Sequence, residues 1–106
     1  MLAEADRQVA AEFRRQLESV IPHFDLRVFG SRARGESGRY SDLDLFVLVP
    51  KITPGLRTTI SEIAWRVGLD ADVVVSTFVA TYEQLESGAL GASPLLHAIE
   101  DEGVPV

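Results

Sequence analysis

A short apolar run from Leu43 to Val49 dictates much of what this 106-residue chain can form. Beyond Asp44 both alternating sets of positions are apolar, and Pro50 ends the run. Because successive strand residues point to opposite faces, this pattern predicts a strand that is covered on both sides. Asp42 and Asp44 stand at its beginning, so their carboxylates are expected at the open, solvated end of a buried strand.

The two aspartates are expected to point the same way, with their backbone positions about 6.5–7 Å apart. Two carboxylates at that spacing can share divalent cations. Magnesium usually takes one or two carboxylates and completes its shell with water and substrate phosphates. On its own an Asp-x-Asp pattern is more often a turn at a strand entry, so the prediction of a metal site depends on the residues around it.

The loop before the aspartates is rich in glycine, serine and arginine. Gly30 and Ser31 follow a predicted strand, and a Gly-Ser turn lets the backbone come close to an anion. Arg32, Arg34 and Arg39 add forked donors that suit phosphate oxygens. In a helical turn only one of Arg32 and Arg34 could face a nucleotide squarely, and Arg39 could simply be solvated. Loop and carboxylates together predict a site for metal-bound polyphosphate.

These residues resemble the signature of the DNA polymerase β-like nucleotidyltransferases. The pair Gly30-Ser31 is followed by ten residues and then by Asp42-Leu43-Asp44. The stretch is most similar to the smallest branch, the minimal nucleotidyltransferase (MNT) proteins, in which the motif is often written Gly-Ser-Arg-Ala-Arg-Gly. This branch includes the MntA-like antitoxins of HEPN/MNT pairs.

The resemblance implies a fold and an activity. The fold would be an α/β (α+β) domain with a small mixed β-sheet and helices packed on it, spanning residues 1–106 as a single domain. The activity would be a metal-dependent transfer of AMP from ATP to a hydroxyl, with two Mg²⁺ ions expected and Mn²⁺ as the alternative. The partner would be a HEPN ribonuclease toxin, adenylylated on a tyrosine, with this chain as its antitoxin.

The resemblance also implies a third carboxylate on the next strand, and Asp72 stands where that pattern would place it. The segment from Ala71 to Ser76 has the composition of a strand. An acid inside so apolar a run is costly unless it is paired, coordinated or at an edge. Asp70 is the alternative, although it follows Gly68 and is better suited to the turn.

Roles in the site follow from the resemblance. Asp42 and Asp44 would share the ions, and Asp72 would bind the ion beside the acceptor. Ser31 would hold the β- and γ-phosphates. The predicted catalytic and metal-binding set is therefore Asp42, Asp44 and Asp72, and the predicted nucleotide-binding set is Gly30, Ser31, Arg32 and Arg34.

Two other functions stay open. The chain could neutralise a partner chiefly by docking, without catalysis. It could instead modify a small molecule, as aminoglycoside nucleotidyltransferases do, although that activity would require an added acceptor-binding domain.

The rest of the chain reads as helices and strands around this site. Residues 2–20 carry apolar side chains at three- and four-residue steps, which predicts an amphipathic helix. Thr53-Pro54 reads as the cap and start of a second helix that would stop near Gly68, with Trp65 facing away from the core. The remaining predictions are a strand from Phe24 to Phe29, a short helix within residues 77–91 anchored by Tyr82, Leu85 and Leu90, and a helix from Ser93-Pro94.

Composition limits the partners. The net charge of −6 and the pI near 4.8 oppose the phosphate-driven binding of extended nucleic acids. The chain has no cysteine, which excludes disulfides and thiolate chemistry. No apolar window is long enough to span a bilayer and the start lacks the pattern of a signal peptide, so a soluble cytoplasmic protein is expected.

Overall fold

A computed structural model describes residues 1–35, 41–88 and 93–106 of the chain. Four strands form one mixed sheet in the order β3-β2-β1-β4. β1 pairs antiparallel with β2 and with β4, whereas β2 and β3 run parallel. The strands are β1 (Asp25–Phe29), β2 (Leu43–Val49), β3 (Val75–Thr81) and β4 (Val104–Pro105).

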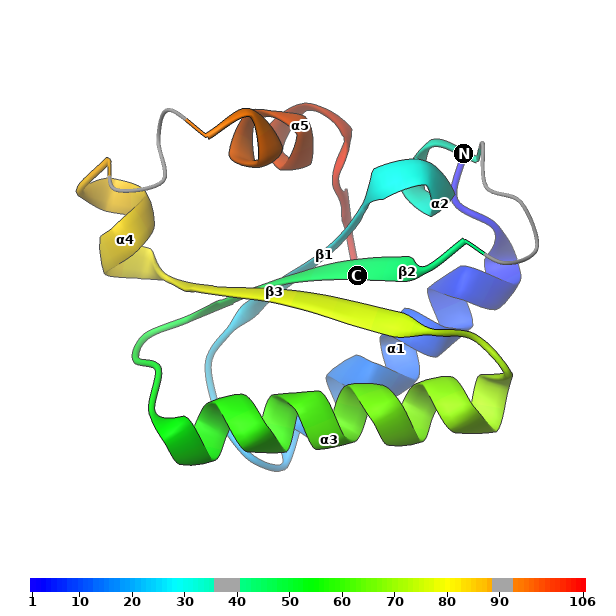
Figure 1. Cartoon of the computed structure of the whole chain (residues 1–106), viewed down its shortest axis with the longest axis horizontal. Helices are drawn as coiled ribbons and strands as arrows, with labels where there is room; N and C mark the ends of the chain where they lie inside the picture. The colour runs from blue at the N-terminus through cyan, green and yellow to red at the C-terminus, as the bar shows by residue number, and fades with distance from the viewer. Residues whose placement is uncertain (36–40, 89–92) are drawn as a thin grey trace.

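Helices cover both faces of this sheet (Figure 1). On one face lie the two long helices, α1 and α3, and on the other face lie α2 and α5. The predicted α+β fold with a small mixed sheet is confirmed. The helices are α1 (Glu4–Glu18), α2 (Gly30–Arg34), α3 (Pro54–Ala71), α4 (Tyr82–Glu86) and α5 (Pro94–Glu102).

β2 is the most deeply buried strand. Its alternate residues from Leu43 to Val49 pack with α1 and α3, and Phe46 and Leu48 pack with α5 on the other face. Only Asp44 within the strand is partly exposed. The prediction of a strand covered on both sides, with the acids at its open end, is confirmed.

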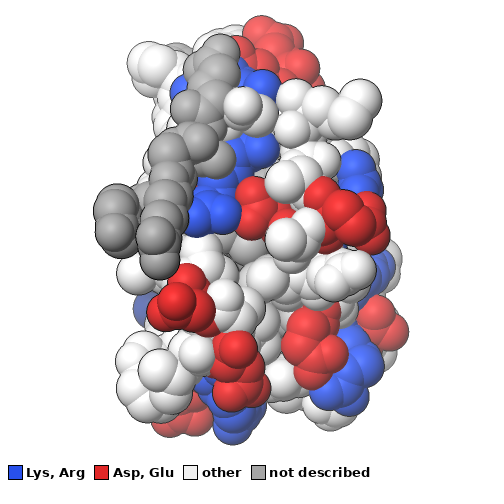
Figure 2. Space-filling model, turned by 90° about the vertical axis from the view of Figure 1, so that its right-hand side faces the viewer, with Lys and Arg blue, Asp and Glu red and all other residues white. Residues whose placement is uncertain are grey.

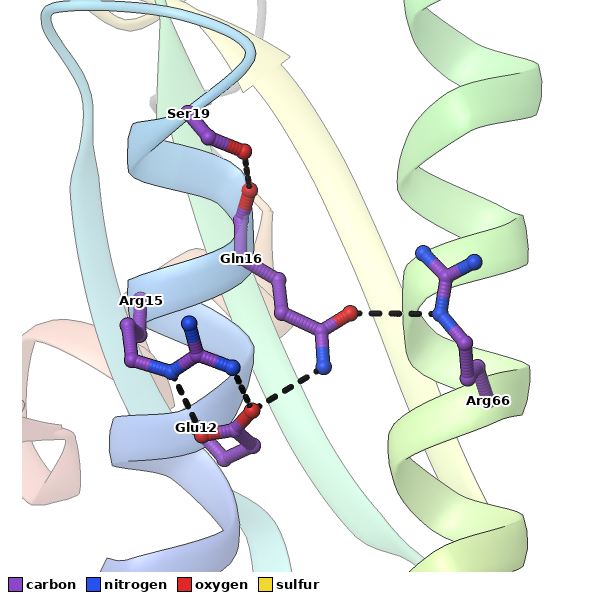
Figure 3. Close-up of polar contacts among 5 residues, drawn as sticks. All are labelled: Glu12, Arg15, Gln16, Ser19 and Arg66. Carbon is purple, nitrogen blue, oxygen red and sulfur yellow. Dashed lines mark hydrogen bonds and ion pairs between the residues drawn. The ribbon is translucent and has the colours of Figure 1, made fainter.

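Polar contacts join the outer surfaces of α1 and α3 above this core (Figure 3). Arg15 and Gln16 both donate hydrogen bonds to the Glu12 carboxylate, and they lower the pKa of Glu12 to about 2. The Gln16 amide oxygen in turn accepts a hydrogen bond from Arg66 Nε of α3 at 3.3 Å. The buried contact between the two helices therefore has a hydrogen-bonded rim.

α3 begins as predicted and ends later than predicted. The Thr53 hydroxyl caps the helix by accepting the Leu56 N–H at 3.1 Å. Gly68 does not stop the helix, which continues to Ala71. A side chain at Gly68 would overlap the Val73 carbonyl, so this glycine is required where the chain folds back over the helix.

The strand predicted from Ala71 to Ser76 is wrong in position. Ala71 is the last residue of α3, and Asp72 caps the helix with a left-handed φ of 56°. β3 starts only at Val75 and continues to Thr81.

Trp65 and the two C-terminal helices lie as the sequence predicts. Trp65 is exposed to 70%, which confirms that it faces away from the core. The short helix anchored by Tyr82 and the helix after Ser93 are confirmed as α4 and α5, whereas Leu90 lies outside the described residues. Among the described helices, none combines the length and hydropathy that a bilayer span requires.

Candidate active site

Asp42, Asp44 and the turn at Gly30 meet at one end of the sheet. Phe29, the last residue of β1, pairs with Asp44 in the antiparallel register, so α2 starts directly beside this acid. Asp44 has the same parity as Phe46 and Leu48 and therefore faces the α5 side of the sheet. The sequence prediction that the turn and the carboxylates converge is confirmed.

Gly30 is in contact with the Asp44 carboxylate. Its φ of 78° lies in the left-handed region that favours glycine. A Cβ at this position would overlap Asp44 Oδ2 and would come within 3.4 Å of Cγ. Ser31 follows in the first turn of α2, partly exposed at the same end of the sheet.

Replacing Gly30 with alanine is expected to damage the site. The left-handed backbone and the overlap with Asp44 should together cost about 1–3 kcal/mol of stability. Displacing the carboxylate should reduce, by about tenfold to a hundredfold, the nucleotide transfer that the sequence resemblance implies. Urea unfolding and initial rates would measure both effects.

Gly55→Ala is the matched control, because this glycine lies in the first turn of α3 and a Cβ there would come no closer than 4.0 Å to its nearest neighbour, Thr53 Oγ1. It should leave the transfer rate unchanged and raise stability slightly, since alanine favours helix. Equal rates for the Gly30→Ala variant and this control would contradict the assignment of Gly30.

The two carboxylates form an electrostatically unfavourable pair. Desolvation raises the pKa of Asp44, and the charge of Asp42 raises it further. Asp42 Oδ2 accepts a hydrogen bond from the Ser76 hydroxyl at 2.9 Å, and Ser76 is the β3 partner of Asp44. All three side chains therefore lie on the same face. A partly buried carboxylate beside a second one suits a divalent cation, which would relieve their repulsion.

Asp72 does not join this pair. It caps α3 and lines a groove under β3, whereas Asp44 faces the other side of the sheet. The β3 residue opposite Asp44 is Ser76, four residues further along the chain. Within the described residues, no group of three acidic or histidine side chains is placed to hold a metal ion. The predicted convergence of three carboxylates is therefore wrong, because the chain forms a helix cap where a strand was expected.

Arg32 points toward α1. Its Nη1 donates to Asp6 Oδ1 at 2.6 Å, and its Nε donates to the Ser41 carbonyl at 2.8 Å. Both charged side chains are nearly buried, with exposed fractions of 13% for Arg32 and 8% for Asp6. The arginine thus fixes the residue immediately before Asp42. Its predicted contact with phosphate stays a prediction.

Arg34 connects α2 to α5. Its Nη1 donates to Glu102 at 2.9 Å, and its carbonyl accepts a hydrogen bond from the Met1 amino group. The short helix that carries Ser31 is thereby held from two sides. Contact of Arg34 with nucleotide stays a prediction, and Arg39 lies outside the described residues.

Three residues of this region were missed from sequence. Ser76 and Glu102 carried no signal, because an isolated serine and a surface-type glutamate occur everywhere. Asp6 did carry one: it follows Leu2 by four residues and precedes Ala10 by four, which places an acid on the apolar stripe of α1.

Comparisons with known proteins agree with this arrangement. A family model described as a nucleotidyltransferase domain matches residues 8–101. The search of curated proteins gives no match.

Solved structures share the fold. A toxin–antitoxin structure with AMP-PNP superposes with a TM-score of 0.64 at 23% identity, covering 91% of this chain and 70% of the other. A mutant of the toxin–antitoxin MntA-HpeT gives 0.61 at 22% identity, covering 91% and 69%. A protein described as a minimal nucleotidyltransferase gives 0.55 at 24% identity, covering 95% of both chains. The TM-scores show a common fold, and identities below 25% show no more than that.

Proposed function

The chain belongs to the nucleotidyltransferase domain family, and we propose that it transfers AMP from ATP to a hydroxyl group of a partner protein. The observation that carries the proposal is the contact between Gly30 and the Asp44 carboxylate, with Asp42 on the same face. This contact brings a turn suited to phosphate next to acids suited to a cation. Such a pair of features is what a nucleoside triphosphate requires.

Asp42 and Asp44 are the residues that would hold Mg²⁺ or Mn²⁺. A bound ion supplies neutralisation of the triphosphate charge and activation of the acceptor hydroxyl. Two carboxylates fit one such ion, and the second ion implied by the resemblance stays a prediction. Ser31 and the backbone around it would bind the β- and γ-phosphates, and Arg32 would keep the Ser41–Asp42 backbone in place.

We take the acceptor to be a tyrosine of a HEPN ribonuclease toxin, which the chain would neutralise as its antitoxin. The likeness to toxin–antitoxin structures, one of them with the ATP analogue AMP-PNP, supports both a toxin partner and ATP as the donor. A small catalytic domain also needs an acceptor surface from elsewhere, and a partner protein supplies one.

The test is to incubate the chain with Mg²⁺, the candidate toxin and ATP labelled either on the α- or on the γ-phosphate. Nucleotide transfer predicts label on the toxin from α-labelled ATP only, with release of one pyrophosphate for each label. Label from the γ-position would mean phosphoryl transfer and would overturn the proposal. Asp44→Asn should abolish the labelling, and Asp70→Asn is its matched control. Asp70 is an exposed acid outside the site, so its replacement should leave the labelling unchanged.

The same experiment separates the two alternatives. Neutralisation of the toxin without label would mean that docking alone suffices. Label on an aminoglycoside, with none on the protein, would assign the chain to small-molecule modification.

A further inference from the structure

β3 has one unoccupied edge. It pairs with β2 on one side, and no strand of the described chain pairs with its other side. Figure 1 looks onto this edge, and no described helix passes in front of it. The Leu43 N–H donates to the Val74 carbonyl at 2.8 Å, so even-numbered residues of this segment bond to β2. The N–H and C=O groups of Thr77 and Val79 therefore point outward.

This edge lacks the devices that usually block a sheet edge. Natural edge strands are commonly protected by lysine, proline, inward charges or a bulge. The seven residues of β3 are valine, serine, threonine, phenylalanine and alanine, and their register with β2 is unbroken from Val75 to Thr81. An outward row of backbone donors and acceptors of this kind is best satisfied by another extended chain.

An apolar groove runs beside the same edge, under β3 and along the second half of α3. Its volume is about 550 Å³. Trp65, Leu69 and Val74 line it, and they expose 70%, 65% and 64% of their surface. The charged side chains in its lining are Arg32, which is ion-paired with Asp6, and Asp72. The groove is therefore largely apolar, with one acidic side chain, Asp72, in its lining.

Figure 2 views the end of the molecule where β2 and β3 begin, and acidic, basic and uncharged surfaces lie side by side there. With a net charge of −6, a second copy of the chain would be repelled electrostatically. A segment with apolar side chains and a basic residue complements both the groove and Asp72.

We propose that the outer edge of β3 and the Trp65 groove bind an extended, apolar and basic segment of the acceptor protein as an added strand. Alternate side chains of that strand would enter the groove, and the others would face the side of Ser76 and Asp44. The added strand would lie about 9–10 Å from β2. A tyrosine side chain on that strand would cover most of this distance toward Asp44. The orientation toward the carboxylates rests on the proposed function, whereas the binding itself does not.

Trp65 provides the measurement, because it is the only tryptophan in the chain. The probe is a synthetic ten-residue peptide of alternating valine and threonine with a central tyrosine and a terminal lysine pair. Titration without ATP should give a saturable blue shift of the Trp65 emission. Two control peptides are expected to bind at least tenfold more weakly: one with glutamates in place of the lysines, and one with prolines at alternate positions.

Variants of the chain locate the binding. Thr77→Pro removes an outward N–H while keeping the bonds to β2, and it should weaken binding by about tenfold or more. Leu69→Ser should act similarly through the groove, and Leu95→Ser on α5 is the exposed apolar control that should change nothing. Circular dichroism checks that each variant is folded.

The outcomes are distinct. Equal binding of the proline-containing peptide, an unshifted Trp65 emission, or a dimer in sedimentation that Leu69→Ser dissociates would each overturn the added-strand proposal. Peptide binding without AMP transfer to any acceptor would sustain this proposal and defeat the proposed function. Undiminished AMP transfer to the acceptor by a folded Thr77→Pro variant would defeat this proposal and sustain the function.

Discussion

Replacing Asp44 with asparagine is expected to abolish nucleotide transfer and, without metal, to make the folded chain more stable at neutral pH. The rate should fall about a thousandfold, because the variant would lose a proposed metal ligand worth several kcal/mol of transition-state stabilisation. Stability should rise because desolvation and the charge of Asp42 both disfavour the ionised Asp44 in the folded state. One substitution thus moves activity and stability in opposite directions.

The pH dependence of stability follows from the sign of this pKa shift. The pKa of Asp44 is raised on folding, so the folded chain holds a proton that the unfolded chain releases first. Wild-type stability therefore falls as pH rises from the usual aspartate range to the raised pKa, and the whole cost is present once the pH lies above that raised pKa. The Asp44→Asn variant lacks this cost, so the two melting temperatures should agree at low pH and separate above that range.

Thermal melts with EDTA or with Mg²⁺ would check this result. Magnesium should raise the melting temperature of the wild type and should not raise that of the variant, since only the wild type has both proposed ligands. A difference between the two proteins that does not change with pH, or full transfer activity in the variant, would contradict the account of Asp44.

The features predicted correctly from sequence are those that side-chain alternation in strands and helix-capping residues determine. β2 followed from apolar side chains on both of its faces, and the start of α3 followed from Thr53 as a cap before Pro54. Strand parity placed Asp42 and Asp44 on one side, and the resemblance to a family motif placed the Gly30 turn beside them. Each of these depends on residues near one another in sequence or on a fixed strand geometry.

The end of α3 could not be predicted in this way. Residues 71–76 have a strand composition, and local propensity alone favours a strand there. In the folded chain the Val73 N–H donates to the Gly68 carbonyl at 3.0 Å, and Asp72 closes the helix in the left-handed conformation with a φ of 56°. Glycine usually occupies this left-handed position, so an aspartate there gave no signal of a helix end, and the third carboxylate of the predicted site was misplaced as a result.

Contacts between distant residues were also beyond sequence reasoning. Arg34 and Glu102 are 68 residues apart, and Asp42 and Ser76 are 34 apart. Their side chains are of types that are usually solvated, and only the assembled sheet and helices bring them together. Arg32 is an example. Its guanidinium could bind either a phosphate or a carboxylate, and sequence alone did not show that it pairs with Asp6.

Breaking the Asp6–Arg32 pair from one side is expected to destabilise the chain by about 3–5 kcal/mol, a large share of the stability of a small domain. Either alanine variant removes the ion pair from a nearly buried position, although Arg32 keeps its hydrogen bond to the Ser41 carbonyl in the Asp6→Ala variant. Arg34→Ala is the matched control, because its pair with Glu102 is partly exposed and should contribute about 1 kcal/mol or less. Urea unfolding of the four proteins would rank them.

A double variant separates the pair's role in stability from its role in the site. Asp6→Leu with Arg32→Met replaces both charges by apolar groups, which should recover most of the lost stability. It cannot restore the hydrogen bond from Arg32 to the Ser41 carbonyl, so the backbone before Asp42 stays unsupported. Magnesium affinity and transfer rate should therefore remain reduced in a well-folded protein. If the double variant recovers magnesium affinity and transfer rate as well as stability, Arg32 acts on stability alone. If the stability losses of the two single variants simply add in the double variant, the two side chains do not form a coupled pair.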